Sequence, residues 1–260
     1  GEALLDWTSA PHAPYTVSDE TFVKLRQLSE QHGLQMHCHI HETQDEIEGS
    51  LKQFGVRPLE RLHKLGLLNE RMIAVHMVHL NEAEIELIAK QGVHLVHNPS
   101  SNLKLASGVA PLKALEAAGV NTVLGTDGAA SNNRQDMFTE IRAAALLAKG
   151  ITGDPLTVSA RTALEMATIR AAKAMGRESD LGSLEAGKLA DVVAVSLDAL
   201  ECRPVYHADA QLVYVAGREH VSDVWVNGRR VLQQRQLTTI DVPALLDRSE
   251  AIVAQMKAGR

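Results

Sequence analysis

The chain has 260 residues, of which 45% are hydrophobic, and it carries a net charge of −6 at neutral pH. A chain of this length buries a large core in one or two domains, and its mild acidity argues against nucleic-acid or anionic-membrane partners, which demand a basic face. No apolar run is long enough to span a bilayer, and no signal peptide is visible. The two cysteines, Cys38 and Cys202, lie far apart in the sequence. We therefore expect a cytoplasmic protein without disulfides and without a membrane or nucleic-acid partner.

Residues 1 to about 175 alternate between apolar runs and helical patterns. The apolar runs predict strands at residues 3–9, 34–40, 72–78, 93–97 and 121–126. The helical patterns predict helices at residues 18–33, 43–54, 58–65, 81–92, 111–118, 135–149 and 156–175. Ser18 and Asn81 are expected to be N-caps, and Gly33 and Gly92 to end the helices that follow them. Strands that alternate with helices indicate an α/β fold with a parallel sheet and right-handed crossovers.

Polar side chains gather where the predicted strands end, as they do on the catalytic face of a (β/α)₈ TIM barrel. Only about five of the eight strand–helix units of such a barrel can be counted, because the pattern changes near Leu181. An open sheet of five strands would have two unpaired edges, which natural proteins avoid. We therefore expect the first three barrel strands to lie upstream of residue 1.

The last 80 residues read as short strands, at residues 189–196, 211–216, 222–226 and 230–233. Asn227-Gly228 between the last two predicts a tight hairpin, and residues 241–256 form an amphipathic helical pattern. We divide the chain into residues 1–180, the C-terminal part of a metal-dependent hydrolase barrel, and residues 181–260, a β-sandwich portion with a C-terminal helix.

Histidines number 12, and seven of them fall in the stretches 37–41, 76–79 and 94–97. His37, His39 and His41 alternate along a predicted strand and should share one face at spacings of roughly 7 Å, so only two could reach a single metal ion. Any one of them could equally be a polar residue that fills a barrel core. As a cluster they indicate a metal site, because histidine is the commonest metal ligand.

The third and fifth strands end in further candidates. His76 and His79 cannot share a face cleanly, so we expect at most one in the site. Asp127 follows the fifth strand, where a carboxylate is costly unless it is paired or bound to metal; the alternative is a turn or N-cap aspartate. With Glu42, these residues bring nitrogen and oxygen ligands and a proton carrier to one centre, as zinc catalysis requires.

Four longer motifs carry a resemblance to a known family. They are His39-x-x-Glu42-Thr43, His76-x-x-His79, the run from His97 to Leu105 and the run from Leu124 to Asn133. These motifs resemble the amidohydrolase superfamily and, more closely, its 5′-methylthioadenosine/S-adenosylhomocysteine deaminases. The run at residues 182–191 is similar to the superfamily's return from the barrel to the β-sandwich. The resemblance covers essentially the whole chain.

The resemblance implies a role for each matching position. His39 and Asp127 would bind one divalent metal ion, which the resemblance implies is Zn²⁺. Asp127 would also be the general base. Glu42 would contact the substrate and protonate the ring nitrogen beside the attacked carbon. His76 would hydrogen-bond the attacking hydroxide and the oxyanion. His12 would contact the sugar of the nucleoside.

The sequence departs from the family in one respect. The first-strand His-x-His pair, which supplies two metal ligands in the family, has no counterpart, because His37-x-His39 belongs to a later strand. The strand count points to the same absent segment. We therefore expect that an N-terminal segment is needed to finish the site.

The implied function is hydrolytic deamination of an adenine nucleoside with release of ammonia, by a homo-oligomer. Two alternatives stay open. A guanine-type or 8-oxoguanine deaminase, or a triazine chlorohydrolase, shares the same residues and would be separated by substrate profiling. An inactive fragment that acts only as a complementing half would be separated by assays with and without the N-terminal segment.

Overall fold

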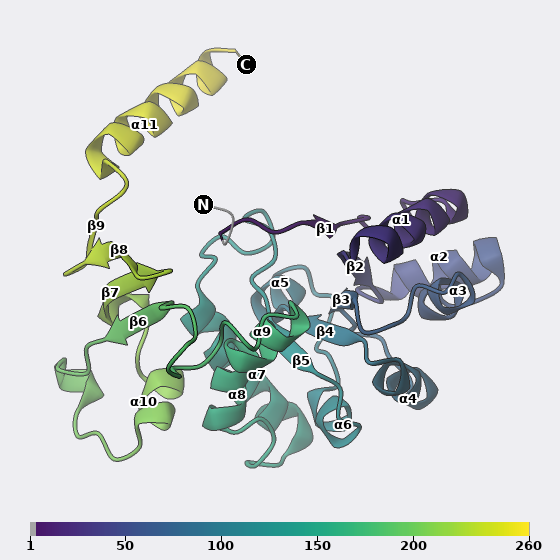
Figure 1. The fold of residues 1–260 in the computed structure, drawn as a ribbon, viewed down its shortest axis with the longest axis horizontal. Coiled ribbons are helices and arrows are strands. Elements are labelled where there is room, and N and C mark those ends of the chain that lie inside the picture. The colour runs from purple at the N-terminus through teal and green to yellow at the C-terminus, as the bar shows by residue number, and fades with distance from the viewer. Residues whose placement is uncertain (1–3, 260) are drawn as a thin grey trace.

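A computed structural model describes residues 4–259 of the chain. Figure 1 shows the order of its elements. The parallel part of the chain contains β1 (Thr8–Ser9), α1 (Asp19–His32), β2 (Gln35–Ile40), α2 (Gln44–Phe54), α3 (Pro58–Lys64), β3 (Met72–His76), α4 (Glu82–Gln91), β4 (His94–His97), α5 (Pro99–Lys104), α6 (Leu112–Ala117), β5 (Thr122–Leu124), α7 (Met137–Thr152), α8 (Ala160–Met166) and α9 (Ile169–Ala174). The remainder contains β6 (Val192–Val195), α10 (Ala208–Tyr214), β7 (Val221–Val226), β8 (Arg229–Gln233), β9 (Gln236–Leu237) and α11 (Val242–Ala258).

The first five strands form one parallel sheet in the order β1-β2-β3-β4-β5. The α/β prediction with five strands is therefore confirmed. Sequential strands are neighbours, and a helix follows each of the first four, as expected of repeated strand–helix units. β1 is shorter than the predicted run at residues 3–9, whose first residue lies outside the described part of the chain.

Helix caps explain where the helices begin and end. The Ser18 side chain accepts a hydrogen bond from the backbone N–H of Thr21, and Gly33 ends α1 at φ +66°. Asn81 forms a capping box with Glu84, and Gly92 ends α4 at φ +71°. Both predicted cap pairs are confirmed, and they satisfy backbone groups that helix ends otherwise leave without partners.

Alternation along β2 sorts its side chains between two faces. Met36, Cys38 and Ile40 are buried in the main core, which also contains Phe22 of α1 and Leu59 of α3. Neighbouring residues of a strand point to opposite faces, so His37 and His39 lie on the other face, where both are only partly buried. The helices thus bury one face of β2, and histidines occupy the other.

Two sequence predictions in the second half are wrong. The pattern at residues 156–175 is not one helix, because α8 and α9 are separated at Thr168, whose backbone lies at φ −130° and ψ −100°. Residues 211–216 are not a strand, because α10 occupies residues 208–214. Val213 of that helix is fully buried, and Arg142 of α7 donates hydrogen bonds to the carbonyls of Val213 and Ala216. Packing against α7 outweighs the β-propensity of the valines and tyrosine there.

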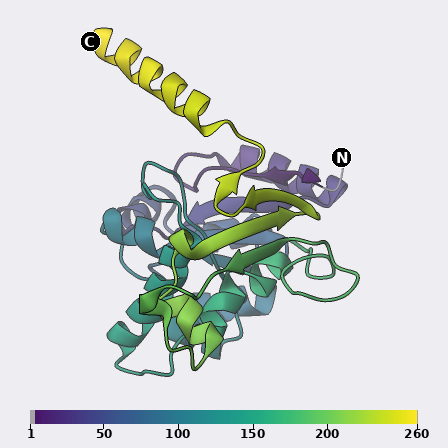
Figure 2. The same ribbon diagram turned by 90° about the vertical axis from the view of Figure 1, so that its left-hand side faces the viewer.

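Strands β6 to β9 form a single antiparallel sheet in chain order, to one side of the parallel sheet (Figures 1 and 2). The hairpin prediction is confirmed, because Asn227 and Gly228 both have positive φ, at +47° and +77°, between β7 and β8. Within residues 4–259 these strands make one sheet and not two, so the sandwich is not confirmed. Helix α11 projects from the body in both views, and none of its residues is buried.

No helix within the described residues is both long and apolar enough to cross a membrane.

Gly125 is expected to tolerate no side chain at the end of β5. A Cβ there would lie 2.5 Å from Oδ1 of Asn98 and 2.7 Å from Cγ1 of Val96, both closer than van der Waals contact. We expect Gly125→Ala to lower the free energy of unfolding by about 1–3 kcal/mol, the usual cost of overpacking. Urea unfolding would measure this. Gly150→Ala is the matched control, because a Cβ on that residue of α7 meets nothing within 4 Å and should stabilise the helix. Equal stability changes for the two variants would contradict the prediction.

Candidate metal centre

Three side chains from different elements converge at the carboxyl ends of the parallel strands. His39 comes from β2, His76 from the end of β3, and Asp127 from the loop after β5. Each offers one nitrogen or oxygen atom, and these three atoms all lie within 4.8 Å of one another. The rings of His39 and His76 are stacked with centroids 5.2 Å apart, and Nε2 of His39 lies 3.9 Å from Oδ1 of Asp127. The predicted ligands His39 and Asp127 are thus brought together, and His76 joins them.

His39 is held in the form that a metal ligand needs. Its Nδ1 lies 2.8 Å from the backbone carbonyl of His12, which can only accept a hydrogen bond. The proton therefore sits on Nδ1, and the lone pair of Nε2 faces Asp127. Metal-binding histidines commonly donate their other ring nitrogen in this way, which fixes both tautomer and ring orientation.

His76 reaches the same centre through an unusual backbone conformation. The strand register pairs it with Ile40, whose side chain is in the core on the helix side. His76 instead adopts φ +75°, which breaks the alternation of the strand. Its Nδ1 lies 2.7 Å from Oδ1 of the fully buried Asn102. Burial lowers the pKa of His76 against the opposing effect of Glu42, so the ring is neutral at physiological pH.

Asp127 also lies in the left-handed region, at φ +60°. Its Oδ2 accepts hydrogen bonds from Ser101 at 2.7 Å and from Ser131 at 2.6 Å. Burial alone would raise the pKa of Asp127, but these two hydroxyls and the backbone N–H of Gly128 together lower it below its ordinary value. The carboxylate is therefore ionised, with Oδ1 left free of those hydroxyls and directed at His39.

Glu42 and His12 flank the three converging groups. Oε2 of Glu42 lies 3.8 Å from Nε2 of His76, and Oε1 accepts a hydrogen bond from Ser107 at 3.2 Å. The ring of His12 meets the ring of His39 edge-on, at 5.2 Å between centroids. Both residues therefore lie next to the candidate ligands.

The other histidines of the sequence clusters take different places. His41 does not share a face with His37 and His39, because it lies past the end of β2 at φ +56° and is fully buried. Its Nε2 accepts a hydrogen bond from the backbone N–H of Leu59. His37 contacts Thr8 at 3.2 Å, and His79 turns its Nε2 to the carbonyl of Ser107. At most one of His76 and His79 was expected in the site, and that residue is His76.

The donor set fits a divalent metal ion of the zinc type. Neutral imidazole nitrogens and an ionised carboxylate are the ligands that zinc prefers, and here they converge with their lone pairs directed inward. His39 and Asp127 would hold such an ion, with His76 beside it. Within the described residues this is one partial ligand set, in which the family's His-x-His pair has no counterpart.

The match to a family model identifies the class of protein. The model described as the amidohydrolase family matches residues 2–231. The chain therefore belongs to the amidohydrolase family.

Curated relatives narrow the likeness within the family. The chain is 49% identical to a 5-methylthioadenosine/S-adenosylhomocysteine deaminase of Teredinibacter turnerae over 91% of this chain and 54% of the relative. It is 44% identical to the enzyme of the same name from Moorella thermoacetica, over 93% of this chain and 56% of the relative. A 5′-deoxyadenosine deaminase of Methanopyrus kandleri is 38% identical over 98% and 59%. The chain thus spans little more than half the length of the curated relatives it matches.

Solved structures agree with this likeness. A crystal structure of an adenosine deaminase from Xanthomonas campestris with bound zinc has a TM-score of 0.94 and 49% identity, covering 96% of this chain and 57% of that one. A triazine hydrolase variant has a TM-score of 0.88 at 28% identity, covering 94% and 54%. The arrangement of these elements is therefore shared with both hydrolases.

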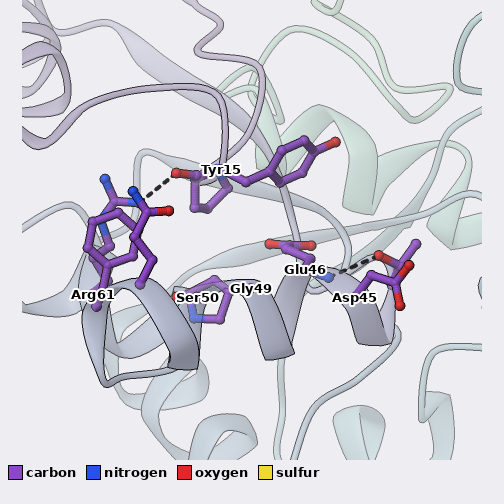
Figure 3. Close-up of a pocket in the computed structure, with 11 residues that line it drawn as sticks. Tyr15, Asp45, Glu46, Gly49, Ser50 and Arg61 are labelled. Atoms are coloured by element: carbon purple, nitrogen blue, oxygen red, sulfur yellow. Dashed lines mark hydrogen bonds between the residues drawn. The ribbon is translucent and has the colours of Figure 1, made fainter.

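A separate cavity of about 370 Å³ lies beside the metal centre, between the loop after β1 and helices α2 and α3 (Figure 3). Tyr15 and Glu46 line it, whereas His39, His76 and Asp127 do not. Burial raises the pKa of Glu46 to about 7, because desolvation outweighs the backbone hydrogen bonds that its carboxylate accepts. One of these comes from the N–H of Glu42, at 2.9 Å.

His41 is expected to make the stability of the fold depend on pH. Burial lowers its pKa from the ordinary value of 6.5 to about 4. Above pH 6.5 the ring is neutral in both the folded and the unfolded chain. Between pH 6.5 and about 4 only the unfolded chain takes up the proton, so stability is lost as the pH falls through this window. At about 1.4 kcal/mol per pKa unit, the loss is about 3 kcal/mol.

Urea unfolding between pH 7.5 and 4.5 would measure this loss. His41→Gln keeps an acceptor for the N–H of Leu59 but does not titrate, so its unfolding free energy should fall less steeply with decreasing pH. Equal slopes for the original chain and the variant would contradict the assignment to His41.

Proposed function

We propose that the protein is a metal-dependent deaminase that hydrolyses the 6-amino group of an adenine nucleoside, of the 5′-methylthioadenosine or S-adenosylhomocysteine type, and releases ammonia. The observation that carries this proposal is the convergence of His39, His76 and Asp127, with Glu42 beside them. The names of the relatives and the zinc in the similar adenosine deaminase support both the reaction and the choice of Zn²⁺.

The metal ion would be held by His39 and Asp127 and would supply a water molecule that ionises near neutral pH. The ionised carboxylate of Asp127 accepts a proton from the attacking water. Nε2 of His76, with its lone pair facing the centre, accepts a hydrogen bond from the other hydrogen of that water and so orients the water for attack.

Glu42 delivers a proton to the ring nitrogen next to the attacked carbon. The bond from water oxygen to C6 forms and the bond from C6 to the amine breaks, so one water proton ends on the ring nitrogen and the other on the departing ammonia. His12 borders this region and would contact the sugar.

The same proposal includes the architecture of the whole protein. The five parallel strands would belong to a (β/α)₈ barrel, with residues 1–180 in the barrel and 181–260 in a β-sandwich portion. An N-terminal segment that carries the His-x-His pair would finish the metal site. A cytoplasmic homo-oligomer is part of the expectation, supported by the family resemblance alone.

A direct test is to measure ammonia release and zinc content together. The chain would be assayed with 5′-methylthioadenosine, S-adenosylhomocysteine, guanine and a chlorotriazine, alone and after co-expression with the N-terminal segment of a relative. Deamination of the adenine nucleosides with about one zinc per chain would support the proposal. Turnover of guanine or the triazine instead would favour the alternatives. The triazine is the more informative of these two substrates, because the chain resembles a triazine hydrolase in structure. Zinc without turnover of any of them would overturn the proposed function.

A further inference from the structure

One short segment contacts three of the candidate functional residues at once. It consists of residues 101–107, the end of α5 and the turn after it, and we call it the α5 turn. Ser101 donates a hydrogen bond to Asp127, Ser107 donates one to Glu42, and Oδ1 of Asn102 accepts one from His76. Ser101, Asn102 and Ser107 are all buried, at 0%, 0% and 6% exposure.

The α5 turn is itself fixed at several points. The backbone N–H of Ser107 donates to the carbonyl of Asn102 at 2.8 Å, which closes the turn on itself. Nε2 of His79 lies 3.0 Å from the carbonyl of Ser107. Lys104 donates to the carbonyl of Ala130, in the loop after Asp127, at 2.7 Å. The segment is therefore tied both to the loop that follows His76 and β3 and to the loop after β5, which carries Asp127.

Each of the three contacts occupies one polar atom of a functional side chain and leaves its other polar atom facing the metal centre. Ser101 shares Oδ2 of Asp127 with Ser131, so Oδ1 is the oxygen turned to His39. Ser107 binds Oε1 of Glu42, so Oε2 is the oxygen nearest to His76. The three contacts thus leave Oδ1 of Asp127, Nε2 of His76 and Oε2 of Glu42 without a bond to the α5 turn, and these atoms face a common centre.

The contact to His76 decides its tautomer. Oδ1 of Asn102 can only accept, so Nδ1 of the neutral ring carries the proton and Nε2 carries the lone pair. Without Asn102 both neutral forms would be populated. A ring with the proton on Nε2 would turn a donor, and not an acceptor, toward the water that attacks the substrate.

We propose that Ser101, Asn102 and Ser107 are positioning residues, through which the α5 turn orients Asp127, His76 and Glu42 as one unit. This inference rests on the proposed function for its effect on turnover, but the orientation itself is a property of the chain. Supporting partners around a site commonly change activity about 10–100-fold when removed.

The first test reads the tautomer of His76 and needs no turnover. The ¹⁵N signals of the ring would be recorded on the chelator-treated chain at pH 8, with His76 assigned by their loss in His76→Gln. We expect one protonated Nδ1 signal and one bare Nε2 signal. In Asn102→Ala both signals should move to intermediate positions. Unchanged ring signals in a folded Asn102→Ala chain would overturn the proposal for Asn102, whatever the substrate proves to be.

The second test compares hydroxyl-deleting and hydroxyl-keeping variants in the assay that reports deamination. Ser107→Ala should lower kcat about tenfold with KM and zinc content unchanged, because the Glu42 carboxylate loses its fixed orientation. Ser107→Thr keeps a hydroxyl and should restore most of the turnover. Ser101→Ala should lower kcat less, because Ser131 still binds the same oxygen of Asp127.

Ser100→Ala is the matched control, since Ser100 lies in the same helix and contributes a backbone N–H, not its hydroxyl, to Glu140. Loss of kcat in Ser100→Ala equal to that in Ser107→Ala, or failure of Ser107→Thr to restore it, would show a structural role and not positioning. A protein that deaminates no nucleoside would defeat the proposed function while the ring signals still decide the tautomer.

Discussion

Glu42→Gln is expected to lower kcat about 10²–10⁴-fold, the range typical of a lost general acid or base. The amide keeps the size of the side chain and an oxygen that can accept the hydrogen bond from Ser107, but it cannot deliver a proton to the substrate ring. Because Glu42 is not among the three converging ligand atoms, zinc content should stay unchanged. Steady-state ammonia release and elemental analysis on the same preparation would measure both quantities.

Glu48→Gln is the matched control for this change. Glu48 lies on the exposed face of α2, six residues after Glu42, and its Oε1 accepts a hydrogen bond from Gln44 of the same helix at 3.4 Å. Glu48→Gln makes the same chemical change at a residue outside the metal centre, so kcat should be preserved. Normal turnover in Glu42→Gln would remove the proton-carrier role, and a parallel loss of zinc would assign the residue to metal binding instead.

Asp127→Asn is expected to lower both turnover and zinc content. The substitution removes the ionised carboxylate that two serine hydroxyls stabilise, and with it the proposed metal ligand and general base. The fall in kcat should be about 10²–10⁴-fold, and the fall in metal affinity should exceed the roughly 10–100-fold that loss of an outer partner causes. Zinc titration by competition with a chromogenic chelator would separate the two effects.

Asp154→Asn is the matched control for Asp127→Asn. Asp154 is a partly exposed aspartate whose pKa is lowered by a hydrogen bond from Lys113, and it is not among the converging candidate ligands. Its replacement should change neither zinc binding nor turnover. Retention of full zinc affinity in Asp127→Asn would mean that the carboxylate is not a ligand.

The sequence was a good guide to the repeated strand–helix units, because their caps are local. Ser18 with Gly33 and Asn81 with Gly92 act within single helices, and the structure places them as predicted. The helix α10 was missed for the opposite reason. Its valine is buried by α7, whose Arg142 binds the carbonyls at its end, and no local pattern reports such a partner.

In the metal centre, too, the sequence revealed some features and not others. His39, Glu42 and Asp127 could be selected from motifs, since their positions relative to strand ends are visible in the sequence. The left-handed conformations of His76 and His41 were not visible, and they turn one histidine into the centre and remove the other from the strand. The α5 turn was noticed only as a motif, because its three contacts cross 26 to 65 residues of chain.

The positive φ angles at the strand ends have a consequence for selection on stability. His76 and Asp127 occupy the left-handed region at +75° and +60°, where a side chain with a Cβ costs roughly 1–3 kcal/mol. Glycine at either position would release that strain, but it would also remove the buried imidazole of His76 or the carboxylate that accepts hydrogen bonds from Ser101 and Ser131. The contacts of the functional groups therefore hold the strained backbone in place. Because strain and function are tied to the same residues, any thermostabilisation campaign on this protein must score zinc binding in every round.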